Sequence, residues 1–241
     1  DARTFKTQMY IHDQSLVKLK EIADAVHLAG GKVSIQLTHC GYFSKNTEFK
    51  RPLAPSRVFN EYGFLSGIVF SKEMTKSNLD KVANDFANAA LKLKEIGFDA
   101  VEVHMGHGYL LSQFLSPWTN KRKDEYGGSI ENRSRFLLEV LKLVREKVGA
   151  DFPVLVKLNL ADGFEGGFSL EDCKYVCQQL EANKCSAVVL SGGFTSRTPF
   201  YLMRGDVPIK GMVENGGSFA ERLTLRLFGP FIVKKFAFTE N

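Results

Sequence analysis

Residues 99–104, Asp-Ala-Val-Glu-Val-His, form a short apolar run typical of a parallel strand that is covered on both faces of its sheet. Before it, residues 78–96 repeat apolar side chains at helical spacing and stop at Gly97. After it, residues 131–148 show the same spacing and stop at Gly149. Strand and helix therefore alternate around this stretch. The alternation predicts βαβ units and a parallel sheet, either open and doubly wound or closed as a barrel.

The rest of the chain continues this rhythm for part of its length. Three more β-branched apolar runs predict parallel strands at residues 32–39, 153–159 and 187–191. Further helices are expected at residues 15–29 and at residues 170–180, where Ser169 and Asp172 have capping-box spacing. Residues 40–75 and 192–241 carry loop signals and predict no clean strand or helix. We expect one α/β domain over residues 1–241.

Composition excludes several classes of protein. With 44% hydrophobic residues and a net charge of 32 − 27 = +5, the chain is neither disordered nor a disulfide framework. No apolar run approaches the roughly 18 residues of a membrane span, and the first residues do not resemble a signal peptide, so we expect a cytoplasmic protein without a span. The densest basic run, residues 121–123, is followed at once by Asp124 and Glu125, which argues against nucleic-acid binding.

The four cysteines form no Cys-x-x-Cys array. Cys173 and Cys177 lie one helical turn apart on a face that we expect to point inward. Buried free thiols are therefore favoured over a redox or metal site, and we predict no bound metal.

Polar residues at the ends of the predicted strands are the candidate site, because ligands of parallel α/β proteins bind beyond the carboxyl ends of the strands. The run His104-Met-Gly-His107-Gly-Tyr109 stands out. Two imidazoles can present N–H groups to one oxygen of a carbonyl or nitro group, and a phenol that is protonated at neutral pH can supply a proton. A structural histidine pair and a zinc site are the alternatives, although no third ligand has zinc-site spacing.

Two other strand residues carry chemistry. Gln36 is either an amide paired within its strand or a bidentate reader of a ring edge with one donor and one acceptor. Lys157 follows three apolar residues on a strand, where an ammonium is costly to bury without an anionic partner. Such a lysine indicates a bound anion or an electron-rich ring. The glycine pairs at residues 166–167 and 192–193 do not match a dinucleotide or Walker loop.

The long run from His104 to Arg135 closely resembles the signature of the Old Yellow Enzyme family, the FMN-dependent NADH:flavin oxidoreductases or ene-reductases. Supporting matches are Gln36-Leu-Thr-His-Cys-Gly41, Lys157-Leu-Asn with Asp162-Gly-Phe-Glu-Gly-Gly167, and Ser191-Gly-Gly193. The resemblance implies a (β/α)₈ TIM barrel that binds FMN. It also implies reduction of electron-poor C=C bonds, next to a carbonyl or nitro group, by NADH or NADPH through ping-pong hydride transfer.

The resemblance further implies a role for each matching residue. His104 and His107 would bind the substrate oxygen, with His104 also touching the flavin, and Tyr109 would protonate the α-carbon. Gln36 would pair with the pyrimidine edge of the flavin. Lys157 stands where the family usually has arginine, beside flavin N1 and the C2 carbonyl, and offers charge without the planar fork.

The same resemblance bears on residues 120–135 and on Tyr42. Residues 120–135 would brace the site. Tyr42 stands where relatives often carry arginine.

The chain would hold only the central portion of such a barrel, because the resemblance implies two strands before Asp1 and two after Asn241. The strands after Asn241 would carry the cradle for the FMN phosphate. An inactive relative that serves as a structural or interaction subunit is therefore the alternative function. Open edges also predict a homo-oligomer, a partner chain or flanking segments that cover them. The apolar side chains of residues 228–238 have no partner element within the sequence, which favours such cover. The alternative is that these residues form an aromatic arm that folds back on the barrel.

Overall fold

The computed structural model describes residues 2–4, 7–45, 51–61, 63, 67–199, 201, 209–215 and 219–234. The elements are, in chain order, α1 (Asp13–Leu28), β1 (Ser34–Leu37), the 3₁₀ helix η1 (Gly41–Phe43), β2 (Leu53–Ala54), β3 (Lys72–Glu73), α2 (Lys76–Glu95), β4 (Ala100–Met105), α3 (Leu110–Leu115), α4 (Ile130–Val148), β5 (Val154–Asn159), α5 (Leu170–Ala182), β6 (Ala187–Ser191), α6 (Ile209–Glu214) and α7 (Phe219–Lys234). Among these residues, no helix is long and apolar enough to span a membrane.

The four strands predicted from the sequence form one sheet. Its order is β1-β4-β5-β6, and every neighbouring pair is parallel. The register places Gln36 beside Glu102, and His104 beside Lys157. The parallel sheet is confirmed. Its strands lie side by side in chain order, as the strands of a (β/α)₈ barrel do.

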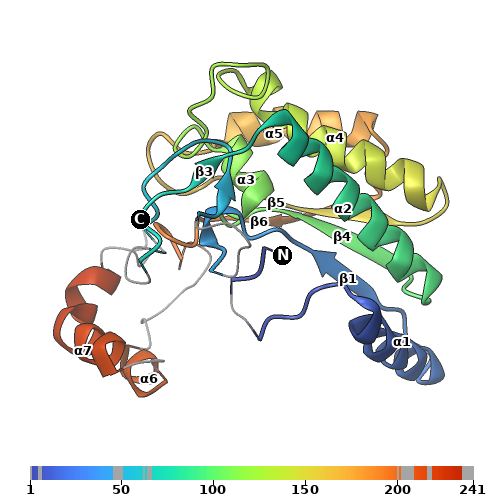
Figure 1. The fold of residues 1–241 in the computed structure, drawn as a ribbon, viewed down its shortest axis with the longest axis horizontal. Helices are drawn as coiled ribbons and strands as arrows, with labels where there is room; N and C mark the ends of the chain where they lie inside the picture. The colour runs from blue at the N-terminus through green and yellow to red at the C-terminus, as the bar shows by residue number, and fades with distance from the viewer. Residues whose placement is uncertain are drawn as a thin grey trace.

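The two faces of this sheet have different surroundings. Helices α2, α4 and α5 lie on one face (Figure 1), and the side chains that point toward them, such as Val103 and Val156, are fully buried. The side chains of the opposite face are only partly covered, with Gln36 and Val189 exposed and Lys157 half-buried. In a closed barrel this second face lines the lumen. The polar residues predicted as a site therefore project from the face that a barrel turns inward.

Local signals explain where the long helices begin and end. The Thr75 hydroxyl accepts a hydrogen bond from the Asn78 N–H at the start of α2. Ser169 and Asp172 form the predicted capping box of α5. Gly97 and Gly149, which follow α2 and α4, have φ values of 100° and 83°, a region that glycine enters at little cost.

The expectation that residues 40–75 and 192–241 hold no regular element was wrong. The first stretch contains η1 and a small parallel sheet of β2 and β3, whose two-residue strands are too short for a period to show. The second contains α6 and α7, which pack against each other to one side of the sheet (Figure 1). Gly229 and Pro230 lie within α7, and both residues have low helix propensity. Of the run 228–238, residues 235–238 lie outside the described part.

Both edges of the four-stranded sheet are open within the described residues. No described strand pairs with the outer side of β1 or of β6. On β6, Val189 and Leu190 are 37% and 54% exposed. Unpaired parallel edges with exposed apolar side chains favour pairing with another chain.

We therefore expect residues 1–241, expressed without flanking sequence, to self-associate or aggregate. Size-exclusion chromatography with light scattering measures this directly. A monodisperse 27.0 kDa species with a cooperative melt would contradict the prediction.

Candidate active site

The turn after β4 carries the central histidine pair. His104 is the next-to-last residue of β4 and is 3% exposed, whereas His107 lies three residues on, in the turn. His107 has φ 58°, a left-handed conformation that is costly for residues with a β-carbon. Gly108 follows with φ 76°, and a Cβ at that position would lie 2.6 Å from the Phe194 ring. The sequence Gly-His-Gly thus permits a tight turn that aims the His107 ring back over the strand ends.

The three predicted catalytic side chains lie together. The His104 ring centroid is 5.0 Å from that of His107 and 5.0 Å from that of Tyr109. Tyr109 is the N-cap residue of α3, and its ring also packs edge-on against Phe43 at 5.8 Å. The arrangement places two imidazoles and a phenol around one small region at the carboxyl end of β4.

Both histidines are held in the neutral form. Burial, reinforced by the Lys157 charge and by the repulsion that a second protonated imidazole at His107 would exert, lowers the pKa of His104 to about 3. Burial and the Lys157 charge also lower the pKa of His107, against a smaller opposing effect of Glu102. A neutral imidazole has one N–H donor and one bare nitrogen. The pair can therefore donate hydrogen bonds without a formal charge of its own.

This pKa shift predicts acid sensitivity. Between pH 6.5 and about 3, His104 takes up a proton in the unfolded chain and not in the folded one. The free energy of unfolding should therefore fall as the pH is lowered through this window, by up to about 1.4 kcal/mol per pH unit. His104→Gln should flatten this dependence, measured by urea unfolding of the polypeptide that contains the chain. Identical slopes in the two proteins would contradict the prediction.

Asn159 holds the histidine turn in place, a role that the sequence did not reveal. Its Oδ1 accepts a hydrogen bond from the His107 backbone N–H at 3.0 Å, and its Nδ2 donates to the Gly193 carbonyl at 2.8 Å. Asn159 is 1% exposed at the end of β5, so it joins the turns that follow β4 and β6. Ser191 completes the contact, with its hydroxyl 2.5 Å from His107 Nε2.

Gln36 and Lys157 converge on a residue that the sequence analysis did not select. Gln36 Nε2 donates a hydrogen bond to Glu102 Oε1, and Lys157 Nζ lies 3.4 Å from the same oxygen. Glu102 therefore supplies the anionic partner that a half-buried lysine requires. Lys157 by itself therefore does not indicate an external anion, because Glu102 matches its charge within the sheet.

One unsatisfied atom indicates that this face accepts a ligand. His104 Nδ1 is buried and has no hydrogen-bond partner in the part of the chain that the structure describes. Buried polar atoms are nearly always paired, so an orphan here calls for a partner. Together with Gln36, Glu102 and Lys157, His104 Nδ1 forms a polar surface on the face of the sheet that a barrel turns toward its lumen. The residues present thus fit a planar heterocycle with both donor and acceptor edges.

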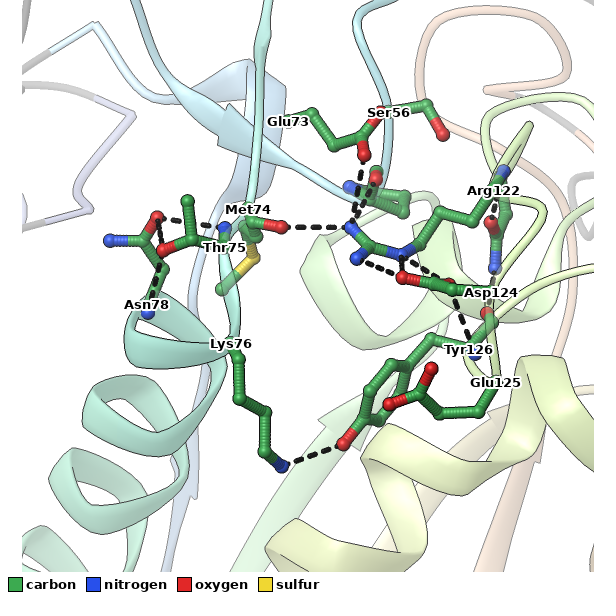
Figure 2. Close-up of polar contacts among 12 residues, drawn as sticks. Ser56, Glu73, Met74, Thr75, Lys76, Asn78, Arg122, Asp124, Glu125 and Tyr126 are labelled. Atoms are coloured by element: carbon green, nitrogen blue, oxygen red, sulfur yellow. Dashed lines mark hydrogen bonds and ion pairs between the residues drawn. The ribbon is translucent and has the colours of Figure 1, made fainter.

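Arg122 lies in the stretch that was predicted to brace the site, and it ties its loop to neighbouring elements (Figure 2). Its guanidinium donates to the carbonyl oxygens of Pro55 at 3.0 Å and Met74 at 2.8 Å, and it forms an ion pair with Asp124. Lys76, at the start of α2, donates to the Tyr126 hydroxyl at 2.7 Å. These contacts tie the loop before α4 to β2, β3 and α2.

A second arginine, Arg133 in α4, contacts two neighbouring helices. Arg133 pairs with Asp172 of α5 at 3.0 Å and also donates to the Leu115 carbonyl at the end of α3. Arg133 therefore connects α4 to α5 and to the end of α3, the helix that follows Tyr109.

Two other features lie apart from this cluster. A hollow of about 770 Å³ runs along the outer edge of β1, between β1, α2 and residues 8–11. Gln36 lines it, whereas the histidine pair and Tyr109 do not. Its position at an open strand edge marks it as a gap beside the sheet. The four cysteines are free thiols, with Cys40 and Cys173 buried and Cys177 and Cys185 partly buried. Within the described residues, no three side chains of the metal-binding types gather to hold an ion.

Comparison with known proteins places this geometry in context. The model of the family described as NADH:flavin oxidoreductase / NADH oxidase matches residues 1–190. A 4,4'-dithiodibutanoate disulfide reductase from Rhodococcus erythropolis is 34% identical over 241 residues, covering 99% of this chain and 59% of that protein. An NADPH dehydrogenase from Listeria monocytogenes is 33% identical over 216 residues, covering 87% of this chain and 60% of that protein. The chain thus spans about three fifths of the length of these curated relatives.

Solved structures show the same relationship. A 2-naphthoyl-CoA reductase in complex with 2-naphthoyl-CoA superposes with a TM-score of 0.75 at 28% identity, over 89% of this chain and 34% of that one. The Old Yellow Enzyme from Pichia sp. AKU4542 superposes with a TM-score of 0.67 at 34% identity, over 74% of this chain and 52% of that one. The sheet described above is therefore part of a (β/α)₈ barrel of the flavin-linked oxidoreductase type.

Proposed function

Because the chain belongs to the NADH:flavin oxidoreductase / NADH oxidase family, we propose that the polypeptide containing it is an FMN-dependent ene-reductase. The substrate class is an alkene made electron-poor by a neighbouring carbonyl or nitro group, and the reductant is NADH or NADPH. The observation that carries the proposal is the convergence of neutral His104, neutral His107 and Tyr109 at one end of β4.

The lumen face supplies the residues that would hold the cofactor. Gln36 would bind the pyrimidine edge, Lys157 would lie toward N1 and the C2 carbonyl, and the orphan Nδ1 of His104 would gain a partner. When bound, FMN accepts a hydride from the nicotinamide and passes it to the β-carbon of the alkene.

The chain's own groups would act on the substrate oxygen and on a proton. The histidine pair would bind the carbonyl or nitro oxygen, where negative charge develops as the hydride arrives. Tyr109 O–H would deliver the proton to the α-carbon. The net change is the addition of H⁻ and H⁺ across C=C while NAD(P)H is oxidised.

The alternative, an inactive structural subunit, has less support. An inactive relative has no need to keep a histidine turn in a costly left-handed conformation or to join it to Asn159 and Ser191. The family match and the grouped acid–base residues favour the enzyme.

Two half-reactions test the proposal. The full polypeptide, purified without added cofactor, should show flavin absorbance that is bleached by NADH or NADPH under anaerobic conditions. Mixing the bleached protein with an enone should restore the colour in proportion to the saturated ketone formed. Absence of flavin binding, or a reduced flavin that an enone and a nitroalkene both fail to reoxidise, would refute the function.

A further inference from the structure

Arg197 occupies an unusual position in the turn that follows β6. Its guanidinium carbon lies 3.9 Å from the centroid of the Trp118 ring and 4.6 Å from that of Phe164. The two rings meet edge to face, with centroids 6.1 Å apart and planes at 83°. The guanidinium therefore sits in an aromatic corner. Stacking of this kind fixes the plane of an arginine while leaving its N–H edge free to bind.

The charge of Arg197 is unmatched in the described part of the chain. Among the described residues no ion pair involves Arg197, and its Nη1 is buried without a hydrogen-bond partner. Asp162, a buried carboxyl of the neighbouring loop, accepts hydrogen bonds from the Phe168 N–H and the Asn159 amide instead. A buried N–H of a cation without an acceptor is costly, and a bound anion would satisfy it.

The turn that carries Arg197 is joined to the catalytic turn. The Thr195 N–H and hydroxyl both donate to the His107 carbonyl, at 3.1 and 2.7 Å. The Ser196 hydroxyl lies 3.1 Å from the Tyr42 hydroxyl, so the position where relatives often carry arginine holds a tyrosine that contacts this turn. Arg197 and His107 therefore belong to one rim at the carboxyl ends of the strands.

A row of aromatic ring contacts connects Arg197 to Tyr109. Phe164 packs against Phe194 at 5.8 Å, Phe194 against Phe43 at 6.2 Å, and Phe43 against Tyr109 at 5.8 Å. Trp118 is 38% exposed, so the corner is open to solvent on that side. Phe43 and Phe194 are each 1% exposed and support this row from inside, whereas Tyr109, Phe164 and Trp118 keep accessible surface. A substrate with an apolar body could therefore have one end at Tyr109 and the other at Arg197.

We propose that Arg197, held by Trp118 and Phe164, is a binding subsite for a carboxylate carried by the alkene substrate at the end remote from its reacting bond. The inference rests on the proposed ene-reductase function and names its substrate class as anionic enones. Planar carboxylates match the fork of a guanidinium, and a fork fixed by stacking loses little entropy on binding.

A binding experiment tests the subsite without catalysis. Trp118 is the one tryptophan of the 241 residues, and an anion bound to Arg197 should change its fluorescence. The full polypeptide is titrated with benzoate, and the same titration of Trp118→Phe is subtracted to isolate the signal. We expect saturable binding that weakens about tenfold or more in Arg197→Gln and less in Arg197→Lys, which keeps the charge without the stacked plane.

A kinetic experiment tests the assignment to the substrate. The pair is 4-phenyl-3-buten-2-one with a para carboxylate and the same enone with a para carboxamide, which has a similar size and no charge. Arg197→Gln should lower kcat/KM for the carboxylate about 10- to 100-fold and leave the carboxamide nearly unchanged. Arg57→Gln is the control for loss of a stacked cation, since Arg57 also stacks on a ring, at 5.0 Å from Phe70, but is exposed and contacts neither Trp118 nor Phe164 in an aromatic corner.

The outcomes separate the two proposals. A carboxylate preference that Arg197→Gln removes and Arg57→Gln keeps supports the subsite. Equal rates for the two enones in the wild-type protein, or equal losses in both arginine variants, would overturn the subsite while leaving ene reduction intact. Benzoate binding at Trp118 without any enone reduction would support an anion site and refute the proposed function.

Discussion

Replacing His107 by alanine should slow the reduction of an enone by the reduced enzyme about 30- to 1,000-fold, because one of two hydrogen-bond donors to the developing oxyanion is lost. The preceding half-reaction, in which NAD(P)H reduces the flavin, should change much less, since no substrate oxygen carries charge at that stage. Stopped-flow absorbance of the two half-reactions in the full polypeptide measures both rates.

The left-handed backbone at His107 supplies the control. His107→Gly also removes the imidazole, but glycine adopts φ 58° without cost, so the turn keeps its conformation. If the lost donor causes the defect, the glycine and alanine variants should be equally slow. His107→Asn should recover part of the rate, because asparagine tolerates this conformation and offers an N–H. Equal losses in both half-reactions would show that His107 has another role.

The sequence was sufficient for the sheet because its strands have a simple pattern. The run at residues 154–159 and its three counterparts are apolar and short, and each is preceded by one of the long helices α1, α2, α4 and α5. Such signals are local. The two-residue strands β2 and β3 are too short to show such a pattern. The residues that follow them, Pro55 and Met74, accept hydrogen bonds from Arg122, which comes from a loop distant in the sequence.

The candidate site was predicted in part for a similar reason. His104, His107 and Tyr109 are close in sequence, so their meeting follows from one turn. The contacts of Glu102 and Asn159 join different strands and depend on register, which a single sequence does not reveal. Alternation along β4 was the available signal, because a glutamate two residues before His104 must share its face.

The charge pair of Lys157 and Glu102 leads to two opposite expectations for the flavin. Lys157→Met should lower the reduction potential of bound FMN and weaken its retention, because the variant removes a positive charge that would stabilise the reduced ring near N1. Glu102→Gln should raise the potential, because it removes the carboxylate 3.4 Å from the ammonium and leaves that charge uncompensated.

The size of both shifts follows from the energy of a charged hydrogen bond. About 1.5–3 kcal/mol per contact corresponds to about 30–60 mV for a two-electron couple. The double variant keeps both side chains near their original size and removes both charges, so its potential should lie between those of the single variants. Redox titration against a reference dye in the full polypeptide gives all four values. Shifts of the same sign in the two single variants, or an unchanged potential in a Lys157→Met protein that still binds FMN, would mean that Lys157 acts only on Glu102 and lies away from the flavin ring.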